Sequence, residues 1–338
     1  VLIRGYGPRF SSIADRARAL TFITAGGLGG ILFGPLVNLI FSFGGKGDFF
    51  HFLINWNLYT LPCLVLIVFN LGALVFVFMM EEPEVERTSR KRSHASFLRR
   101  IYRWFRTLFD DIDSPLLFVL LVVKMTSVGG FYAVLTTLMQ HLSAVAGLDA
   151  PTRVLVFSGG QIGAGFLSAI FAALYTVFLR TKRLFHPTYT FLYAMILFSG
   201  FALITLPWPF ASPVVLYDNE TAPHGCNSDT FEWCKTTHLI DLRIWFGFGC
   251  FFMGVAMPLS LIAQDILYSR VLEHSTRADL FQGFYGMVDC ITLTFVPWKV
   301  GGLYKSLGPA VLYSIVAIVL IATCCFFALF IPRFKRAL

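Results

Sequence analysis

Charged side chains are scarce in this sequence. Lys, Arg, Asp and Glu make up 14% of its 338 residues, whereas hydrophobic residues make up 57% and include 37 phenylalanines. Ordinary soluble domains carry about 25% charged residues, because they need polar surface to face water. The composition therefore excludes an ordinary soluble domain of this length and indicates a membrane protein.

The sequence also lacks the motifs that would indicate an enzyme. It has no His-x-x-x-His or His-Glu pair in an apolar run, no glycine-rich phosphate loop and no Gly-x-Ser-x-Gly elbow. Its seven histidines are scattered. Four of them, His51, His141, His224 and His238, fall at one face of the predicted spans and are expected to be solvated loop residues. We expect no enzymatic activity, no metal site and no cofactor.

Long apolar runs are what the sequence has in abundance. A bilayer needs about 20 apolar residues for each spanning helix. The runs here are long, continuous and not alternating, which favours helices over strands. We therefore predict an all-α polytopic membrane protein with eight spans, near 19–43, 53–80, 115–141, 152–179, 187–208, 243–267, 280–304 and 308–331.

The basic residues predict the orientation of these spans. Lys and Arg concentrate on cytosolic loops, and the alternate connections of this chain are the basic ones. Both termini are therefore expected to be cytosolic. The topology accounts for the net charge of +8, so no nucleic-acid partner is implied. The basic segments are 1–18, 87–106, 180–183, 270–277 and 333–336.

The loop 209–242 carries three signs of the opposite, lumenal or external, face. Asn219 begins an Asn-Glu-Thr acceptor for N-glycosylation, which must face away from the cytosol to be used. Cys226 and Cys234 are the two cysteines outside the spans, and a disulfide between them needs an oxidising compartment. We expect a glycosylated, disulfide-bonded loop.

The segment 81–113 divides the chain unequally. It is charged and basic, ends in an amphipathic stretch, and leaves two predicted spans before it and six after it. That asymmetry suggests a six-plus-six transporter whose first four helices are absent, since such transporters are built from paired repeats. Residues 1–80 would be the remnant of an N-terminal half, 81–113 a cytosolic linker, and 114–338 a C-terminal six-helix half.

Glycines recur at helical spacing in two spans. Gly26, Gly30 and Gly34 share one helix face, followed by Pro35, and small faces of this kind allow close helix approach in lipid. The alternative is simple helix dimerisation through the same face. Gly159 and Gly163 are expected to form a second close-packing face.

Several short elements resemble the lysosomal branch of the major facilitator superfamily. The resemblance implies a major-facilitator-type helix bundle with eight of a probable twelve spans present, placed in an endosomal or lysosomal membrane. It covers both ends of the chain and is weak between about 100 and 240. The matching elements are Arg4-x-Tyr6, Asp15-Arg16, Gly30-x-x-x-Gly34-Pro35, Lys46-Gly47, Asn57-x-Tyr59-Thr60-x-Pro62, Leu267-Tyr268-Ser269-Arg270 and Gln282-Gly283.

Three ionisable residues fall within predicted spans: Lys124, Asp289 and Lys299. Such residues are candidates for function by default, because burying a charge in the bilayer is costly. Lys124 and Asp289 are predicted at similar depth, on helices that are neighbours in the superfamily fold, so we expect them to meet. The pair is either a proton- or substrate-linked switch or a fixed ion pair, and Lys299 is expected near the far interface.

Uncharged polar residues in the spans are weaker candidates. Gln140, Gln161 and Gln264 either line a cavity or tie helices together. The leading function is secondary active transport of a small solute by alternating access. The alternatives are a channel-like anion conduit of the same fold and a non-transporting membrane scaffold. The expected partners are a small-molecule or ion substrate and the lipid bilayer, with no oligomer required.

Overall fold

The computed structural model describes residues 112–145, 148, 150–178, 186–216, 225–273, 275 and 278–337, with four helical residues before them, Val68, Leu71, Gly72 and Val75. All but those four belong to the compact unit that contains Asp111–Leu338. The predictions for the span 19–43, including Gly26, Gly30, Gly34 and Pro35, lie outside the described residues. The same holds for Asn219 and for nearly all of 53–80 and 81–113.

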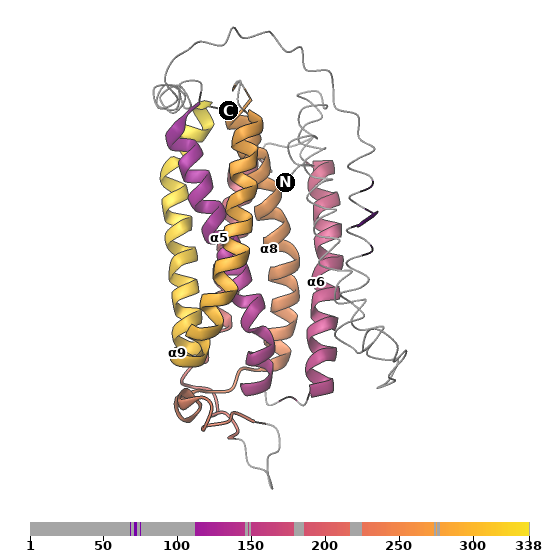
Figure 1. Ribbon diagram of the computed structural model, residues 1–338, viewed down its shortest axis with the longest axis vertical. Coiled ribbons are helices and arrows are strands. Elements are labelled where there is room, and N and C mark those ends of the chain that lie inside the picture. The colour runs from indigo at the N-terminus through magenta and orange to yellow at the C-terminus, as the bar shows by residue number, and fades with distance from the viewer. Residues whose placement is uncertain are drawn as a thin grey trace. The chain divides into compact units, whose positions relative to one another are not determined.

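Within the described part, the long elements are all helices. Five of them are long and apolar enough to cross a membrane, which confirms the prediction of a helical, membrane-spanning protein for these residues. A short 3-10 helix, η2 (Glu232–Thr236), lies in the loop between α7 and α8. The five helices are α5 (Ser114–Ala144), α6 (Ala150–Phe178), α7 (Pro187–Ile204), α8 (Leu242–Val271) and α9 (Ala278–Ala337) (Figure 1).

Local capping explains where two of these helices begin. The Asp113 carboxylate accepts a hydrogen bond from the Leu116 amide at 3.4 Å, and proline occupies the first turn of α5. The His186 Nδ1 accepts from the Thr188 amide at 3.4 Å, and Pro187 opens α7. Both arrangements satisfy or remove amides that a helix start leaves without partners.

The longest helix, α9, contains a reversal at Gly308. Gly308 has φ 78° and ψ 173°, which is not helical and lies in the region that glycine tolerates best. A Cβ atom there would lie 2.7 Å from Cγ of Trp233, so space as well as conformation requires glycine. Pro309 follows and cannot donate a backbone hydrogen bond to continue the first arm. The break expected between the spans 280–304 and 308–331 is present.

The first arm of α9 runs parallel to α5. Lys124 of α5 lies beside Asp289, with 3.5 Å between Nζ and Oδ1. Further along both helices, His141 Nδ1 lies 3.1 Å from the Tyr304 hydroxyl. The residue numbers of both partners rise together, which is the signature of parallel neighbours.

The second arm of α9 runs antiparallel to α5. Arg333 contacts Asp113 at the start of α5, with 2.9 Å between Nη2 and Oδ1. Tyr313 contacts Thr137 near the end of α5, with 3.0 Å between the two hydroxyl oxygens. The two arms are therefore antiparallel to each other, and Figure 1 shows the orange and yellow arms of α9 side by side.

Helices α7 and α8 also run antiparallel to each other. Phe201, late in α7, packs on Phe252 of α8 with ring centroids 6.1 Å apart. At the other end, burial and then the positive charges of Arg270 and Lys335 lower the pKa of His186, so the last turns of α8 and α9 face the start of α7. Basic residues thus gather at one end of the bundle.

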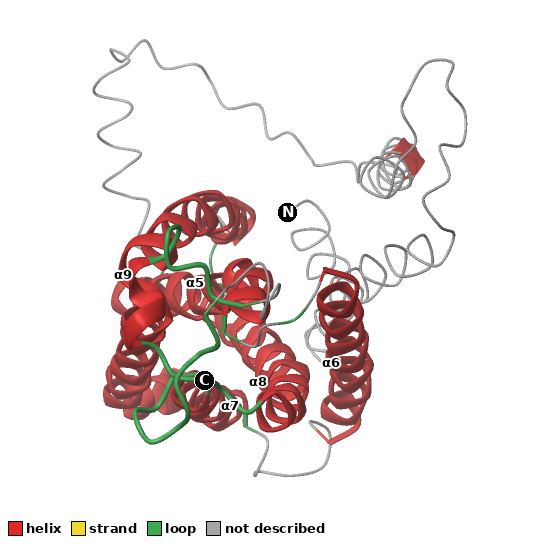
Figure 2. Cartoon of the chain, turned by 90° about the horizontal axis from the view of Figure 1, so that it is seen from below, coloured by secondary structure: helices red, strands yellow, loops and turns green. Residues whose placement is uncertain are grey.

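The loop between α7 and α8 covers the opposite end. It contains the predicted disulfide between Cys226 and Cys234, whose Cα atoms are 5.7 Å apart. The Trp233 indole N–H donates to the Lys305 carbonyl at 3.2 Å, and its ring packs on Tyr304 at 5.5 Å. Seen from this end, the loop lies across the helix bundle (Figure 2). We call residues 205–241 the disulfide loop.

Replacing Trp233 by alanine is expected to loosen the disulfide loop without unfolding the bundle. The change removes one hydrogen bond and the ring contacts with Tyr304 and Phe231, which together contribute about 1–3 kcal/mol. Proteolytic cleavage between 225 and 241 should accelerate about tenfold. Trp208→Ala, at a tryptophan that is 42% exposed, is the control and should leave cleavage unchanged. Equal cleavage rates in wild type and Trp233→Ala would contradict the role of Trp233.

Candidate functional site

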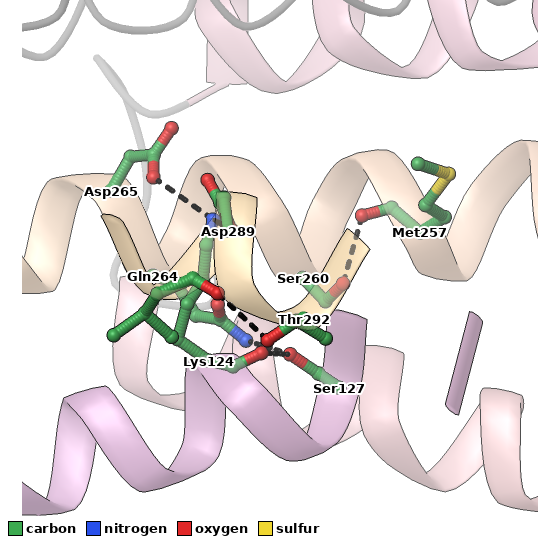
Figure 3. A network of polar contacts seen from close by, with 9 residues as sticks. Lys124, Ser127, Met257, Ser260, Gln264, Asp265, Asp289 and Thr292 are labelled. Carbon is green, nitrogen blue, oxygen red and sulfur yellow. Dashed lines mark hydrogen bonds and ion pairs between the residues drawn. The ribbon is translucent and has the colours of Figure 1, made fainter. Parts of the chain in front are cut away.

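A cluster of charged side chains lies in the interior of the bundle, where α5, α8 and α9 meet (Figure 3). Lys124 is 0% exposed. Its Nζ atom lies 3.5 Å from Oδ1 of Asp289 and 3.7 Å from Oδ1 of Asp265. The predicted approach of Lys124 and Asp289 is confirmed, and a second carboxylate joins them. We call Lys124, Asp265 and Asp289 the charge cluster.

Asp265 is the member that sequence reasoning missed. The predicted span ended at 267, which placed Asp265 at a membrane surface where a carboxylate needs no partner. The structure continues α8 to Val271, and the Asp265 side chain is 2% exposed. The signal was the position of Gln264 and Asp265 inside an apolar run that ends only at Arg270.

The cluster lies well inside the bundle. Lys124 is ten residues from Ser114, the first residue of α5, which corresponds to roughly 15 Å along the axis. Asp265 lies six residues before Val271, the last residue of α8, which corresponds to roughly 9 Å. A hydrocarbon core is about 30 Å thick, so residues at these distances from the helix ends are expected to lie within it.

Two stacked tyrosines support the ammonium group. Lys124 Nζ lies 4.6 Å from the ring centroid of Tyr285, close enough for a cation–π attraction. Tyr268 of α8 stacks on Tyr285 at 4.1 Å between centroids. The Tyr268 hydroxyl donates to the Phe281 carbonyl at 2.6 Å, which fixes its ring between α8 and α9. These contacts restrict where the Lys124 side chain can lie.

Gln264 ties two helices together beside the charge cluster. Its Nε2 donates to the Ser127 hydroxyl at 2.8 Å, and Ser127 in turn donates to the Lys124 carbonyl at 3.2 Å. Gln264 is predicted either to line a cavity or to hold helices together, and the structure shows the second role. Gln140 is exposed, and the structure brings it into neither the charge cluster nor the cavity described below.

The charge balance of the cluster is unequal. Within the cluster, two carboxylates contact one ammonium group, and burying charged groups is costly unless each of them is paired. Asp289 is the accessible member, because its side chain is 20% exposed whereas that of Asp265 is 2% exposed. Asp289 is therefore the member of the cluster that a cation from solvent could reach most easily.

Lys299 does not join the charge cluster. It lies ten residues beyond Asp289 in α9, is exposed, and places its Nζ 4.1 Å from the ring centroid of Trp298. Grouping Lys299 with Lys124 and Asp289 as one charge site is therefore wrong. Its long side chain reaches the surface, as expected for a lysine near the end of a span.

Gln161 lines a cavity between α5, α6, α7 and α8. The cavity has a volume of about 40 Å³, is partly open, and is lined mostly by aromatic and aliphatic side chains. Its position near Phe201 and Gly249 places it in the half of the bundle that the disulfide loop covers. Gln161 is predicted either to line a cavity or to hold helices together, and the structure shows the first role.

The close packing predicted through the glycines of α6 is not found at Gly159. A Cβ atom at Gly159 would meet nothing within 4 Å, so the expectation of close packing there is wrong. The close approach lies at Gly254 of α8, where a Cβ would be 2.7 Å from Leu167 Cβ and 2.8 Å from the Ala164 carbonyl oxygen. The small residue that matters is on the partner helix, which the spacing within α6 does not reveal.

His141 is buried rather than solvated. It is 3% exposed, bonds Tyr304 and packs edge-on against Tyr313 at 5.2 Å between centroids. The expectation of a solvated loop residue is wrong because α5 continues to Ala144 and the reversal of α9 covers this turn. His141 therefore joins α5 to both arms of α9 beneath the disulfide loop.

Comparison with known proteins adds no family to this geometry. No protein-family model and no curated protein matches the chain. The charge cluster and the cavity are therefore the features that bear on function.

Proposed function

We propose that the chain forms part of a secondary active transporter that moves a small solute by alternating access, with the charge cluster as its coupling site. The observation that carries the proposal is the contact of buried Lys124 with two carboxylates from two other helices. Ionisable groups deep in a membrane protein typically mark ion or substrate pathways.

The mechanism follows from the unequal charge balance. With both carboxylates ionised, Lys124 holds α8 and α9 against α5. A proton on Asp289 removes one of the two attractions, which weakens the contact between α5 and α9 and leaves Lys124 with Asp265. A change of this kind can bias an equilibrium between two packings of the helices. The competing role, a fixed ion pair, predicts no such bias.

The helix arrangement supports the fold part of the proposal. The described helices and the two arms of α9 alternate in direction, as consecutive spans must, and such a six-helix unit fits one half of a major-facilitator-type transporter. We propose cytosolic placement of the basic end, by the distribution of Arg and Lys. The disulfide loop then faces an oxidising lumen, in keeping with an endosomal or lysosomal membrane.

The anion conduit is the weaker alternative. Lys124 is fully buried and contacts two carboxylates, so its ammonium group is already paired and is not available to attract an anion. The scaffold alternative offers no reason for placing three ionisable groups in the interior. We therefore favour a transport role over both alternatives.

Replacing Asp289 by asparagine is expected to abolish proton-coupled flux. The full-length transporter that contains this chain would be reconstituted in liposomes that contain a pH-sensitive dye and exposed to neutral amino acids, hexoses, small carboxylates and benzamide as probes. At least one probe should produce saturable acidification that Asp289→Asn reduces to the level of protein-free liposomes. The control is Arg333→Gln, which breaks the half-exposed ion pair with Asp113 and should retain flux.

Two outcomes would contradict the transport proposal. A current that rises linearly with voltage and does not saturate would favour a conduit. Flux that persists unchanged in Asp289→Asn would reduce the charge cluster to a structural ion pair.

A further inference from the structure

The cavity that Gln161 lines, between α5, α6, α7 and α8, differs in chemistry from the charge cluster. Among the described residues that line it, none is ionisable, and the polar side chains are Gln161 and Ser168. The remainder of the wall is aromatic, aliphatic or thioether and includes Phe131, Phe201, Met253 and Met257. A charged ligand placed here would lose its hydration without meeting an opposite charge, which is strongly unfavourable.

Gln161 is the polar group available to a ligand. The residue is 7% exposed, and its side-chain amide forms no hydrogen bond with any part of the chain that the structure describes. A hydrogen bond to a ligand in these mostly apolar surroundings would be favourable. The amide can donate and accept, so it matches an amide, a hydroxyl or a carbonyl group.

The size of the cavity limits what can enter. One water molecule needs about 10–15 Å³ of such volume, whereas the cavity has about 40 Å³ and is partly open. The space therefore accepts only a few atoms of a ligand, such as one polar end group, with the rest of the ligand extending through the opening. Thioether side chains such as those of Met253 and Met257 adapt to ligands of varied shape.

We propose that this cavity binds an uncharged, largely apolar small molecule through one hydrogen-bonding group held by the Gln161 amide. The inference rests on the proposed transport function and names its substrate class. Charged solutes, including amino acids and small carboxylates, are excluded from the cavity.

The cavity and the charge cluster share two helices. On α5, Phe131 of the cavity lies seven residues from Lys124, and on α8, Met257 lies eight residues from Asp265. Each interval corresponds to roughly 10–12 Å along a helix. A ligand that separates α5 from α8 at the cavity thus acts on the same pair of helices that the Lys124–Asp265 contact holds together.

The test uses two photoreactive probes of the same shape, trifluoromethyl-diazirine derivatives of benzamide and of benzoate. The chain would be placed in lipid nanodiscs and irradiated, and its labelled peptides would be identified by mass spectrometry. The benzamide probe should label α6 and α8 peptides saturably and be displaced by excess unlabelled benzamide. The benzoate probe should show only the non-saturable labelling expected from the bilayer.

The Gln161→Leu variant isolates the hydrogen bond. Leucine keeps much of the volume but removes the amide, so half-saturation by the benzamide probe should shift upward about tenfold. The matched control is Gln140→Leu on the exposed face of α5, which should leave half-saturation unchanged. Thermal unfolding of both variants checks that they fold.

Three results would overturn the inference: saturable benzoate labelling equal to that of benzamide, equal half-saturation in Gln161→Leu and wild type, or labelling that benzamide cannot displace. The last result would mean that lipid chains fill the cavity. The comparison of the two probes needs only the wild-type chain. Binding of the probe requires no ion gradient, so the two proposals can fail separately. Displaceable labelling without flux would refute transport but not the binding site. Flux without displaceable labelling would refute the binding site but not transport.

Discussion

The Lys124→Met variant should be less stable than the wild type by about 3–5 kcal/mol, which is the usual cost of breaking a buried ion pair from one side. Methionine preserves the length of the side chain but removes the ammonium group that both Asp265 and Asp289 contact. The expected result is a large fall in the melting temperature of the purified chain in detergent.

A triple variant distinguishes the loss of charge attraction within the cluster from the loss of side-chain packing around Lys124. Lys124→Met combined with Asp265→Asn and Asp289→Asn removes every charge from the cluster, so most of the lost stability should return. Buried ion pairs replaced as a whole are often neutral or stabilising. If the triple variant were as unstable as Lys124→Met, packing around Tyr285 rather than charge would explain the loss.

The second large effect is expected at Gly254. An alanine there places its Cβ atom 2.8 Å from the Ala164 carbonyl oxygen and 2.7 Å from the Leu167 Cβ. Neither atom is the end of a flexible side chain, so α6 and α8 must move apart, at a cost of about 1–3 kcal/mol. Thermal unfolding in detergent measures this loss.

Gly247 provides the matched control in the same helix. A Cβ at Gly247 meets nothing within 4 Å, so Gly247→Ala should be neutral or slightly stabilising, because alanine favours helix. Equal losses in the two variants would show that helix flexibility, rather than the approach of α6 to α8, is what alanine disturbs.

The helices could be predicted from the sequence because each apolar run is long and its ends carry caps or breakers. Asp113, His186 and Gly308 mark such ends, and the helix boundaries follow them. The disulfide was also predictable, because Cys226 and Cys234 are the two cysteines in a loop expected to face an oxidising compartment. These are local properties of the chain.

The remaining features depend on contacts between distant segments. Asp265 belongs to the charge cluster only because α8 continues past the expected end of its span. His141 is buried by residues more than 160 positions away. The close approach of α6 and α8 depends on Gly254 rather than on Gly159. In each case the missing information is which helix faces which, and that information is not present in the periodicity of one segment.

The packing of Trp233 against the reversal of α9 has a consequence for biosynthesis. Trp233 needs the Lys305 carbonyl and the space above Gly308, and the ribosome makes both of them later than the loop itself. In the proposed orientation, the loop therefore reaches the lumen with its two cysteines before its docking surface exists. Oxidation of Cys226 and Cys234 can precede insertion of the final hairpin, but the tryptophan can take its place only afterwards.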